Sequence, residues 1–393
     1  MFKVANILSH LKGDKVIWLL TLVMLGASLI TVYSFVPILV RTQGGTPFKY
    51  LMKHFVYVLI GLTAMYWMHK QNPSNLSKFS KVIFYFAIGL LIFTFFFGVR
   101  VNDASRWIRI PIVSLTFQTS DFAKLALVIY ISRLLVKKKD VLNKLKDGFL
   151  PIALAILVIV GLIVKDNFST AALLLLISSV ILFIGKVPFK MMFGFFGAMI
   201  GMFLLVVMMH KALPEANILN RWDTWEKRIL NKTADDSEKL VIDNIQSMNA
   251  ELAIHNGGLS GQGAGKGRLK LYTAEAYADF FYASFVEEFG LIGGVVLVFV
   301  YLILLFRIIR IGLKSERLFE TYLAIGIGLI IMTQATVNMF VCTGLFPVTG
   351  QNMPILSLGG SALVMVCVSL GIIQSIARDQ NGERVEELIE EQE

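Results

Sequence analysis

Residues 150–164 read LPIALAILVIVGLIV and residues 171–184 read AALLLLISSVILFI, and these two runs decide the fold class. Only the short segment 165–170 separates them. A helix needs roughly 20 mainly apolar residues to cross a hydrocarbon core of about 30 Å. It also satisfies its own backbone polar groups, as every lipid-embedded segment must. We therefore predict two adjacent membrane-spanning helices, at 149–165 and 169–187.

The same apolar signal recurs along the whole chain. Its 393 residues are 56% hydrophobic and 16% charged, with a mean hydropathy of +0.70. Soluble domains are roughly 45–50% apolar and about 25% charged. We expect an all-α, polytopic membrane protein with one membrane domain over residues 1–393. Its ten predicted spans are 16–39, 51–69, 82–99, 120–136, 149–165, 169–187, 189–209, 280–306, 319–344 and 354–377.

Lysine and arginine placement predicts the orientation, because short cytoplasmic loops are enriched in these residues. With the N-terminus inside, the inner segments hold most of the short-loop cations, including the cluster from Arg133 to Lys146. Both termini are then cytoplasmic and the long loop at about 210–279 faces outward. The net charge of +10 needs no nucleic acid as a partner. Membrane lipids are the expected partners of the cytoplasmic cations.

Three further features complete the predicted organisation. In the long loop, Asn217–Val241 is expected to lie as an amphipathic helix at the interface, and Asp243–His255 to form a second helix. The tail at 378–393 is short and acidic. Cys342 and Cys367 both fall in predicted spans, which argues against a disulfide framework.

A glycine-rich run, Gly257–Gly267, ends the long loop's second predicted helix. It resembles a nucleotide phosphate loop only superficially, because Gly267 follows Lys266 where a Walker A motif has Ser or Thr. The backbone at Gly263 and Gly265, with Lys266, is able to approach a pyrophosphate or sugar closely. A flexible hinge that binds nothing fits the pattern equally well.

Ionisable residues at membrane depth are functional candidates by default, because they are costly there. Asp121 and Lys124 lie one turn apart and can pair, either in a site or at a helix start. Asp166 follows Lys165 and is either functional or the cap of the next helix. Glu287 and Glu288 are expected to clamp the bundle through Lys124 or an arginine, or to touch substrate.

Asp279 is the strongest catalytic candidate. It lies where the polar loop gives way to Phe280-Phe281-Tyr282. Carboxylates at such boundaries can be tuned for proton abstraction, as a general base requires. The alternative is that Asp279 simply caps the eighth span.

Several motifs together resemble the SEDS (shape, elongation, division and sporulation) family, polytopic glycosyltransferases that polymerise peptidoglycan. The resemblance covers nearly the whole chain, and the short tails resemble the cell-division branch more than the elongation branch. The matching segments are Asn102–Ile108, Phe117–Lys124, Asn167–Ala171, Gly257–Phe280, Glu287–Gly290, Gly344–Gly350 and Pro354–Ser361.

The resemblance implies a function and roles for individual residues. Asp279 matches the family's essential loop aspartate and would act as general base. Lipid II would be donor and acceptor, and a class B penicillin-binding protein and other divisome proteins would be partners. The expected place is the bacterial inner membrane at the division septum. A divalent cation, Mg²⁺ or Mn²⁺, is a possible cofactor, although the sequence shows no ligand cluster for one. The implied substrate contacts are Lys124, Arg106, Glu275, Gly263, Gly265, Lys266, Ser357, Gly359, Gly360 and Ser361.

The chain departs from the family pattern at several positions. Thr119 replaces a proline, Asp121 a glutamate, Asn167 an aspartate and Ser169 a glycine. Thr273-Ala274 replaces Leu-Pro, and Leu358 replaces an aromatic residue. None of these changes touches Asp279 or Lys124. Two other functions stay open: a transporter that flips lipid II, and a scaffold that recruits the transpeptidase.

Overall fold

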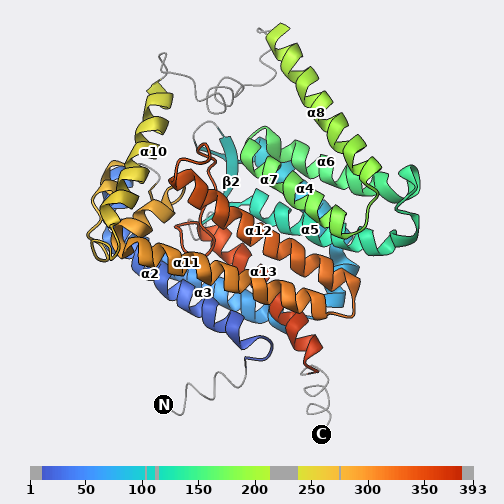
Figure 1. Ribbon diagram of the computed structural model, residues 1–393, viewed down its shortest axis with the longest axis horizontal. Helices are drawn as coiled ribbons and strands as arrows, with labels where there is room; N and C mark the ends of the chain where they lie inside the picture. Colours follow the sequence, from blue (N-terminus) through green and yellow to red (C-terminus); the bar gives the residue numbers. More distant parts are fainter. Residues whose placement is uncertain (1–10, 102–103, 111–114, 213–237, 274–275, 383–393) are drawn as a thin grey trace.

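A computed structural model describes residues 11–101, 104–110, 115–212, 238–273 and 276–382 (Figure 1). The structure is dominated by helices, as predicted. The helices are α2 (Lys15–Gln43), α3 (Pro47–Lys70), α4 (Pro73–Phe97), α5 (Thr119–Lys137), α6 (Leu150–Val164), α7 (Phe168–Ile184), α8 (Phe189–Ala212), α10 (Glu238–Gly257), α11 (Phe281–Lys314), α12 (Leu318–Cys342) and α13 (Gly360–Gln380). Shorter helical turns are η1 (Lys139–Val141), η2 (Leu145–Phe149) and η4 (Leu269–Tyr272).

Eight described helical segments are long and apolar enough to cross a membrane. They are α2, α3, α4, η2 with α6, α8, α11, α12 and α13. The apolar helix α7 is shorter, at 17 residues, and α5 has 19 residues. With these two helices added, each of the ten predicted spans corresponds to one helix, and the all-α membrane fold class is confirmed.

The three largest differences between the helix bounds and the predicted spans have local reasons. Helix α4 begins at Pro73 rather than 82, because Asn72 caps it by accepting a hydrogen bond from the Ser74 amide. Helix α11 runs past 306 to Lys314, since a helix can continue beyond the apolar core. Helix α13 begins at Gly360 rather than 354, because the preceding segment is irregular and the Tyr301 hydroxyl donates to the Pro354 carbonyl.

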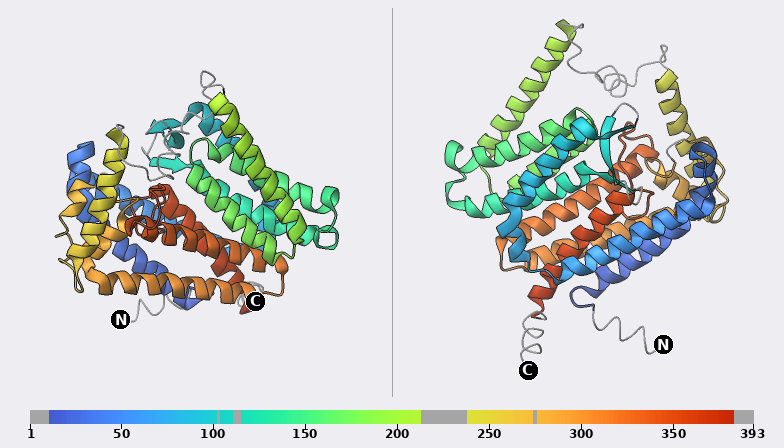
Figure 2. Two further views of the ribbon diagram at one scale, coloured as in Figure 1. Left: turned by 45° about the horizontal axis from the view of Figure 1, so that its top comes forward. Right: turned by 180° about the vertical axis from the view of Figure 1, so that it is seen from behind.

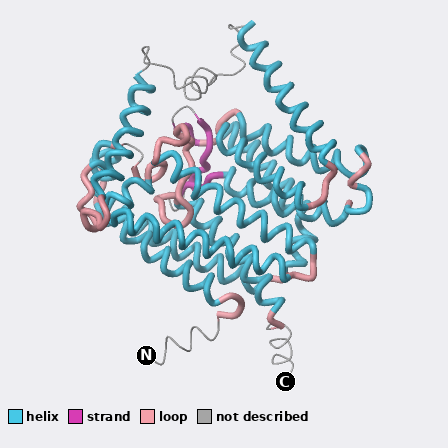
Figure 3. Tube along the Cα trace, viewed as in Figure 1, coloured by secondary structure: helices cyan, strands magenta, loops and turns pink. Residues whose placement is uncertain are grey.

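A small antiparallel sheet, which was not predicted from the sequence, connects α4 to α5. Its strands are β1 (Val99–Val101), β2 (Ala104–Ile110) and β3 (Leu115–Gln118), in the order β1-β2-β3. The β2–β3 register pairs Trp107 with Gln118. Figure 3 shows these strands beside irregular loops at one end of the helix bundle. The sheet thus brings β2 to the face where the long connections lie.

The core lies along α12 and α13. In the most apolar stretch of α13, 78% of residues are buried, and 67% in α12, against 17% in α8. Helix α13 packs closely on α3, because Gly371 has no side chain. A β-carbon at this position would come within 2.6 Å of the Met65 carbonyl oxygen. Helix α8 and the first turns of α10 instead extend away from the bundle (Figures 1 and 2), whereas the later turns of α10 pack on α11, with Ala250 and Ala253 buried. Helix α8 therefore presents most of its apolar surface outward, as a lipid-facing helix does.

The two ends of the described chain lie on the same face. One pocket is lined by residues 13–16, before and at the start of α2, and by Ala377, Gln380 and Asn381, at the end of α13. An even number of crossings places both ends on one side of a membrane, as ten spans would.

The predicted helix at Asp243–His255 lies within α10, which ends at Gly257. Of the predicted amphipathic helix at Asn217–Val241, residues 217–237 lie outside the described residues, as does most of the acidic tail.

Candidate active site

Asp279 lies in a turn just before α11 and is half-buried. Helix α11 begins at Phe281, and Phe280 occupies its N-cap position. Asp279 is therefore not the N-cap residue, and the alternative raised by the sequence is not what the structure shows. The Asp279 carboxylate oxygen Oδ2 lies 3.9 Å from the position that a β-carbon on Gly350 would take. The carboxylate thus borders the loop that follows α12.

Asn338 holds the backbone around Asp279 in place. Its buried side-chain amide nitrogen donates to the carbonyl oxygens of Ala278 (3.1 Å), Asp279 (3.0 Å) and Gln351 (2.9 Å). Its side-chain oxygen accepts from the Tyr282 amide at 3.3 Å. One side chain of α12 therefore ties the Asp279 turn to the loop before α13. Buried amide groups need such partners, because leaving them unpaired is costly.

Arg106 on β2 approaches the same place from another direction. Its Nε and Nη2 donate to the Asp166 carbonyl oxygen at 2.9 and 2.6 Å. Its Nη1 lies 3.9 Å from the position that a β-carbon on Gly350 would take, the same distance as Asp279 Oδ2. The structure thus brings together two residues singled out from the sequence, the Arg106 guanidinium and the Asp279 carboxylate, on the loop at Gly350.

Asp166 contributes its backbone here. The predicted side-chain cap at Asp166 is wrong, because Asn167 is the N-cap of α7 and accepts from the Thr170 amide at 3.1 Å. The asparagine that departs from the family pattern therefore performs the capping itself. Thr170 also accepts a hydrogen bond from the Gln351 side chain at 2.8 Å. The start of α7 is thereby joined to the same loop before α13.

The start of α13 packs against α3 and β3. The Ser361 hydroxyl accepts from the Gln118 amide at 3.0 Å. A β-carbon on Gly360 would collide with the Tyr57 ring, and the Tyr57 hydroxyl bonds the backbone of Thr116. The Ser357 hydroxyl donates to the Met353 carbonyl at 2.7 Å, and a β-carbon on Gly359 would lie 2.8 Å from the Asn352 amide nitrogen. These four predicted contact residues shape the loop and the start of α13.

Lys124 and Asp121 form the predicted ion pair on the first turns of α5. The Lys124 Nζ lies 2.8 Å from Asp121 Oδ1, and both side chains are less than 10% exposed. The second carboxylate oxygen of Asp121 is buried and has no hydrogen-bond partner among the described residues. Asp121 therefore balances the charge of Lys124 at the start of α5.

The glycine run is inserted into a break in α11. At Gly290 the backbone has φ 73° and ψ 178°, so the helix is interrupted there. The Leu291 and Ile292 amides donate instead to the carbonyls of Gly258 and Leu259. In return, the amides of Gln262 and Gly263 donate to the carbonyls of Glu287 and Glu288, each at 2.9 Å. The exposed loop at Gly265 and Lys266 projects beyond this contact.

Glu287 and Glu288 hold the rest of that loop. Glu287 accepts from the amides of Arg268 (2.9 Å) and Leu269 (3.1 Å). Glu288 forms a buried ion pair with Lys270 and accepts from the Ser34 hydroxyl on α2. The ion-pair partner of Glu288 is therefore Lys270. The expected partner, Lys124 or an arginine, was wrong for this carboxylate.

Two expectations from the sequence concern Glu275 as a substrate contact and a divalent cation as a cofactor. Glu275 lies outside the described residues. Within the described part of the chain, no group of three or more His, Cys, Asp or Glu side chains is placed to hold a metal ion. Sequence reasoning also missed Asn338 and Gln351. A polar residue inside the apolar α12 was the available signal for Asn338.

Comparison with known proteins identifies the family. The model of the FtsW/RodA/SpoVE family, described as "Cell cycle protein", matches residues 14–382. The chain therefore belongs to this family, in agreement with the resemblance seen in its motifs. With its apolar helices, it is a multi-pass membrane protein.

Similar proteins cover almost the whole chain. One is a probable peptidoglycan glycosyltransferase FtsW of Geobacter sulfurreducens, 31% identical over 94% of this chain and 96% of the relative. Another, of the same description, is from Trichlorobacter lovleyi, 29% identical over 93% of each chain. Two solved structures share the fold: RodA of Thermus thermophilus (TM-score 0.66, 22% identity, 94% and 97% coverage), and a chain from work on polymerization and crosslinking by a peptidoglycan synthase complex (TM-score 0.70, 20% identity, 94% and 98% coverage).

Proposed function

We propose that this protein is a peptidoglycan glycosyltransferase that polymerises lipid II into β-1,4-linked glycan strands. The observation that carries the proposal is the meeting of the Asp279 carboxylate and the Arg106 guanidinium at Gly350. A carboxylate able to accept a proton and a fixed cation are the two groups that this displacement needs. The names of the relatives support the same activity.

The chemistry is a single displacement with inversion. The 4-hydroxyl of the acceptor attacks the anomeric carbon of the donor, and the bond from that carbon to the pyrophosphate oxygen breaks. Asp279 takes the hydroxyl proton, a role that contributes roughly 10²–10⁴-fold to a rate. Undecaprenyl pyrophosphate leaves with the bonding electrons, and Arg106 offsets the negative charge that develops on it.

The surrounding residues position these two groups. Asn338 fixes the backbone that carries Asp279, and the Asp166 carbonyl holds two guanidinium nitrogens of Arg106. The third nitrogen, Nη1, lies 3.9 Å from the position that a β-carbon on Gly350 would take. Catalytic groups held in this way lose little orientation during the reaction, which is the basis of preorganised catalysis.

A divalent cation would have to share its ligands with the substrate. Since no cluster of three protein ligands is found in the described part of the chain, Mg²⁺ or Mn²⁺ would rest on Asp279 and pyrophosphate oxygens. Mg²⁺ sites of this kind, with one or two carboxylates and substrate phosphates, are common. Such an ion would neutralise charge on the leaving group.

We further propose that the protein acts in cell division, at the outer face of a bacterial inner membrane. The FtsW description of its relatives supports the division role. A class B penicillin-binding protein is the proposed partner, since a structurally similar chain comes from a complex that couples polymerization to crosslinking. Other divisome proteins would complete the assembly.

The test is a reconstitution with labelled lipid II. The purified chain, with and without a class B penicillin-binding protein, is placed in vesicles, and both glycan strands and lipid II transport are measured. We expect strands from the wild type and none from Asp279→Ala. A chain that moves lipid II across the bilayer but makes no strand would be a transporter. A chain that does neither, yet binds the transpeptidase, would be a scaffold. Either result would overturn the proposal.

A further inference from the structure

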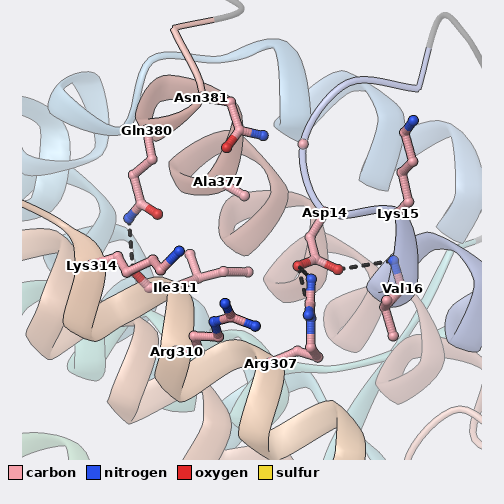
Figure 4. A pocket seen from close by; sticks show the side chains of 11 residues that line it. Asp14, Lys15, Val16, Arg307, Arg310, Ile311, Lys314, Ala377, Gln380 and Asn381 are labelled. Carbon is pink, nitrogen blue, oxygen red and sulfur yellow. Dashed lines mark hydrogen bonds and ion pairs between the residues drawn. The ribbon is translucent and has the colours of Figure 1, made fainter.

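A second site lies at the opposite end of the bundle, where both ends of the described chain meet. It is a pocket of about 360 Å³ between the start of α2, the last turns of α11 and the end of α13 (Figure 4). Its side chains are strongly basic: Lys15, Arg307, Arg310 and Lys314, against the single carboxylate of Asp14. No part of the proposed reaction uses this pocket.

Asp14 is fully engaged and neutralises only one of these cations. Its Oδ1 accepts from the amides of Val16 and Ile17 at 2.9 and 3.0 Å, which caps α2. Its Oδ2 accepts from Arg307 Nε at 2.9 Å and pairs with Nη2. Asp14 and Arg307 therefore form a closed structural unit that joins α2 to α11.

Arg310 and Lys314 are left with uncompensated charge. Both lie one helical turn apart on α11 and are exposed, and within the described residues neither side chain has a hydrogen bond or an ion pair. Figure 4 shows both reaching toward the space beside Arg307. The Gln380 side chain pins the end of α13 to the Ile311 carbonyl at 2.7 Å, which keeps the pocket's third wall in place. These contacts hold the walls of the pocket together, and its lining side chains carry a net positive charge.

Apolar side chains lead from these cations along the outer surface of the bundle. On α11, Arg310 follows Phe306 and Leu302 at four-residue spacing, and these two are 62% and 42% exposed. On α2, Lys15 at the rim precedes Leu19 and Val23 at the same spacing, 61% and 57% exposed. Residues four apart share one helix face. Each helix therefore offers a basic end that continues into a lipid-facing apolar stripe.

We propose that this pocket binds the phosphate of an anionic lipid headgroup, whose acyl chains lie along the stripes of α2 and α11. Only a ligand with a negative head and an apolar tail uses both features. A soluble anion would not contact the apolar stripes of α2 and α11. The acidic segment that follows Gly382 would not contact them either. Basic residues at a membrane surface attract anionic lipids in this way. By joining α2, α11 and α13, the lipid would stabilise the helix ends as a unit.

Lipid retention by the full-length chain tests this site. Purified protein is titrated with dioleoyl phosphatidylglycerol or dioleoyl phosphatidylcholine, and bound lipids are counted by native mass spectrometry. The test variant is Arg310→Gln with Lys314→Gln. The charge-matched control is Arg41→Gln with Lys49→Gln, both exposed, near the end of α2 and the start of α3 and outside the basic cluster from Arg133 to Lys146. We expect the test variant to lose one phosphatidylglycerol site, with affinity reduced roughly 10–30-fold, and the control to keep it.

Several results would overturn the proposal. They are an equal loss in the control variant, no loss in the test variant, or equal retention of phosphatidylcholine. Displacement of the lipid by inorganic phosphate at equal concentration would assign the pocket to a soluble anion. Stronger phosphatidylglycerol binding by a chain ending at Gly382 would show that the acidic segment occupies the pocket instead.

Discussion

Arg106 shows how one residue can serve both structure and chemistry. Two of its nitrogens donate to the Asp166 carbonyl, and the third, Nη1, lies as close to the β-carbon position of Gly350 as Asp279 Oδ2 does. Lysine retains the charge but cannot reproduce this fork of donors. The geometry of the guanidinium, and not its charge alone, is therefore what the site requires.

Substitution Arg106→Lys should lower strand synthesis while leaving the protein folded. A hydrogen bond to a charged group is worth about 1.5–3 kcal/mol, so losing one predicts a reduction of roughly 10–100-fold. The measurement is the rate of polymerisation from labelled lipid II. Arg109→Lys, an exposed arginine on the same strand, is the control and should keep wild-type activity. Equal effects of the two substitutions would contradict a specific role for Arg106.

Substitutions in the Lys124–Asp121 pair can show whether its role is structural or chemical. Lys124→Met leaves the Asp121 carboxylate buried without its partner, which typically costs about 3–5 kcal/mol. The double variant Asp121→Asn with Lys124→Met removes both charges and should recover most of that stability in thermal unfolding. If the double variant also polymerises lipid II normally, the pair is purely structural. A stable but inactive double variant would show that Lys124 contributes to the reaction.

At the scale of elements, the positions of the helices followed from the sequence, but the role of the glycine run did not. Apolar runs such as 150–164 predict a span locally, because lipid leaves the backbone no alternative to a helix. The glycine run was compatible with a ligand loop or a hinge. Its actual contacts are with Glu287, Glu288, Leu291 and Ile292, and no local pattern reveals which distant helix will be interrupted.

The candidate site was also predictable only in part, because its local motifs are visible in the sequence and its long-range contacts are not. Asp279 was chosen from its place where the polar loop meets an apolar helix and was supported by the family resemblance, whereas Arg106 was chosen from the resemblance alone; the structure places both at Gly350. Asn338 was not chosen, although a polar residue within an apolar helix was a visible signal. The small sheet was missed because short strands depend on long-range packing, such as the contact of Arg106 on β2 with the Asp166 carbonyl. The cap of α7 was assigned one residue too early, to Asp166 instead of Asn167.

The break in α11 predicts a clear effect of substituting Gly290. A β-carbon there would collide with the Leu259 carbonyl, and its φ of 73° strains any L-residue. Gly290→Ala should therefore lower stability by about 1–3 kcal/mol, with loss of polymerisation, because the glycine run can no longer insert. Gly161→Ala in α6 is the control, since nothing lies within 4 Å of its β-carbon position. It should be neutral or slightly stabilising. Equal stability of the two variants would refute the insertion.

For the molecule as a whole, the proposed orientation places the glycine-run loop and the α5–α6 connection on opposite sides of the membrane. Cys342 and Cys367, both 0% exposed, give little background labelling. Lys266→Cys should react with an impermeant thiol reagent in intact spheroplasts. Lys139→Cys should react only after permeabilisation. The reverse pattern would invert the topology, and with it the proposed outer location of Asp279.

The central claim, that Asp279 removes the proton from the attacking hydroxyl, is tested most directly by the single-turnover rate of Asp279→Asn. Asparagine keeps the size and hydrogen-bonding shape of the side chain but does not accept the proton. With lipid II binding and thermal stability verified as unchanged, the rate of strand formation should fall roughly 10²–10⁴-fold. A rate within a few-fold of wild type would show that another group is the base.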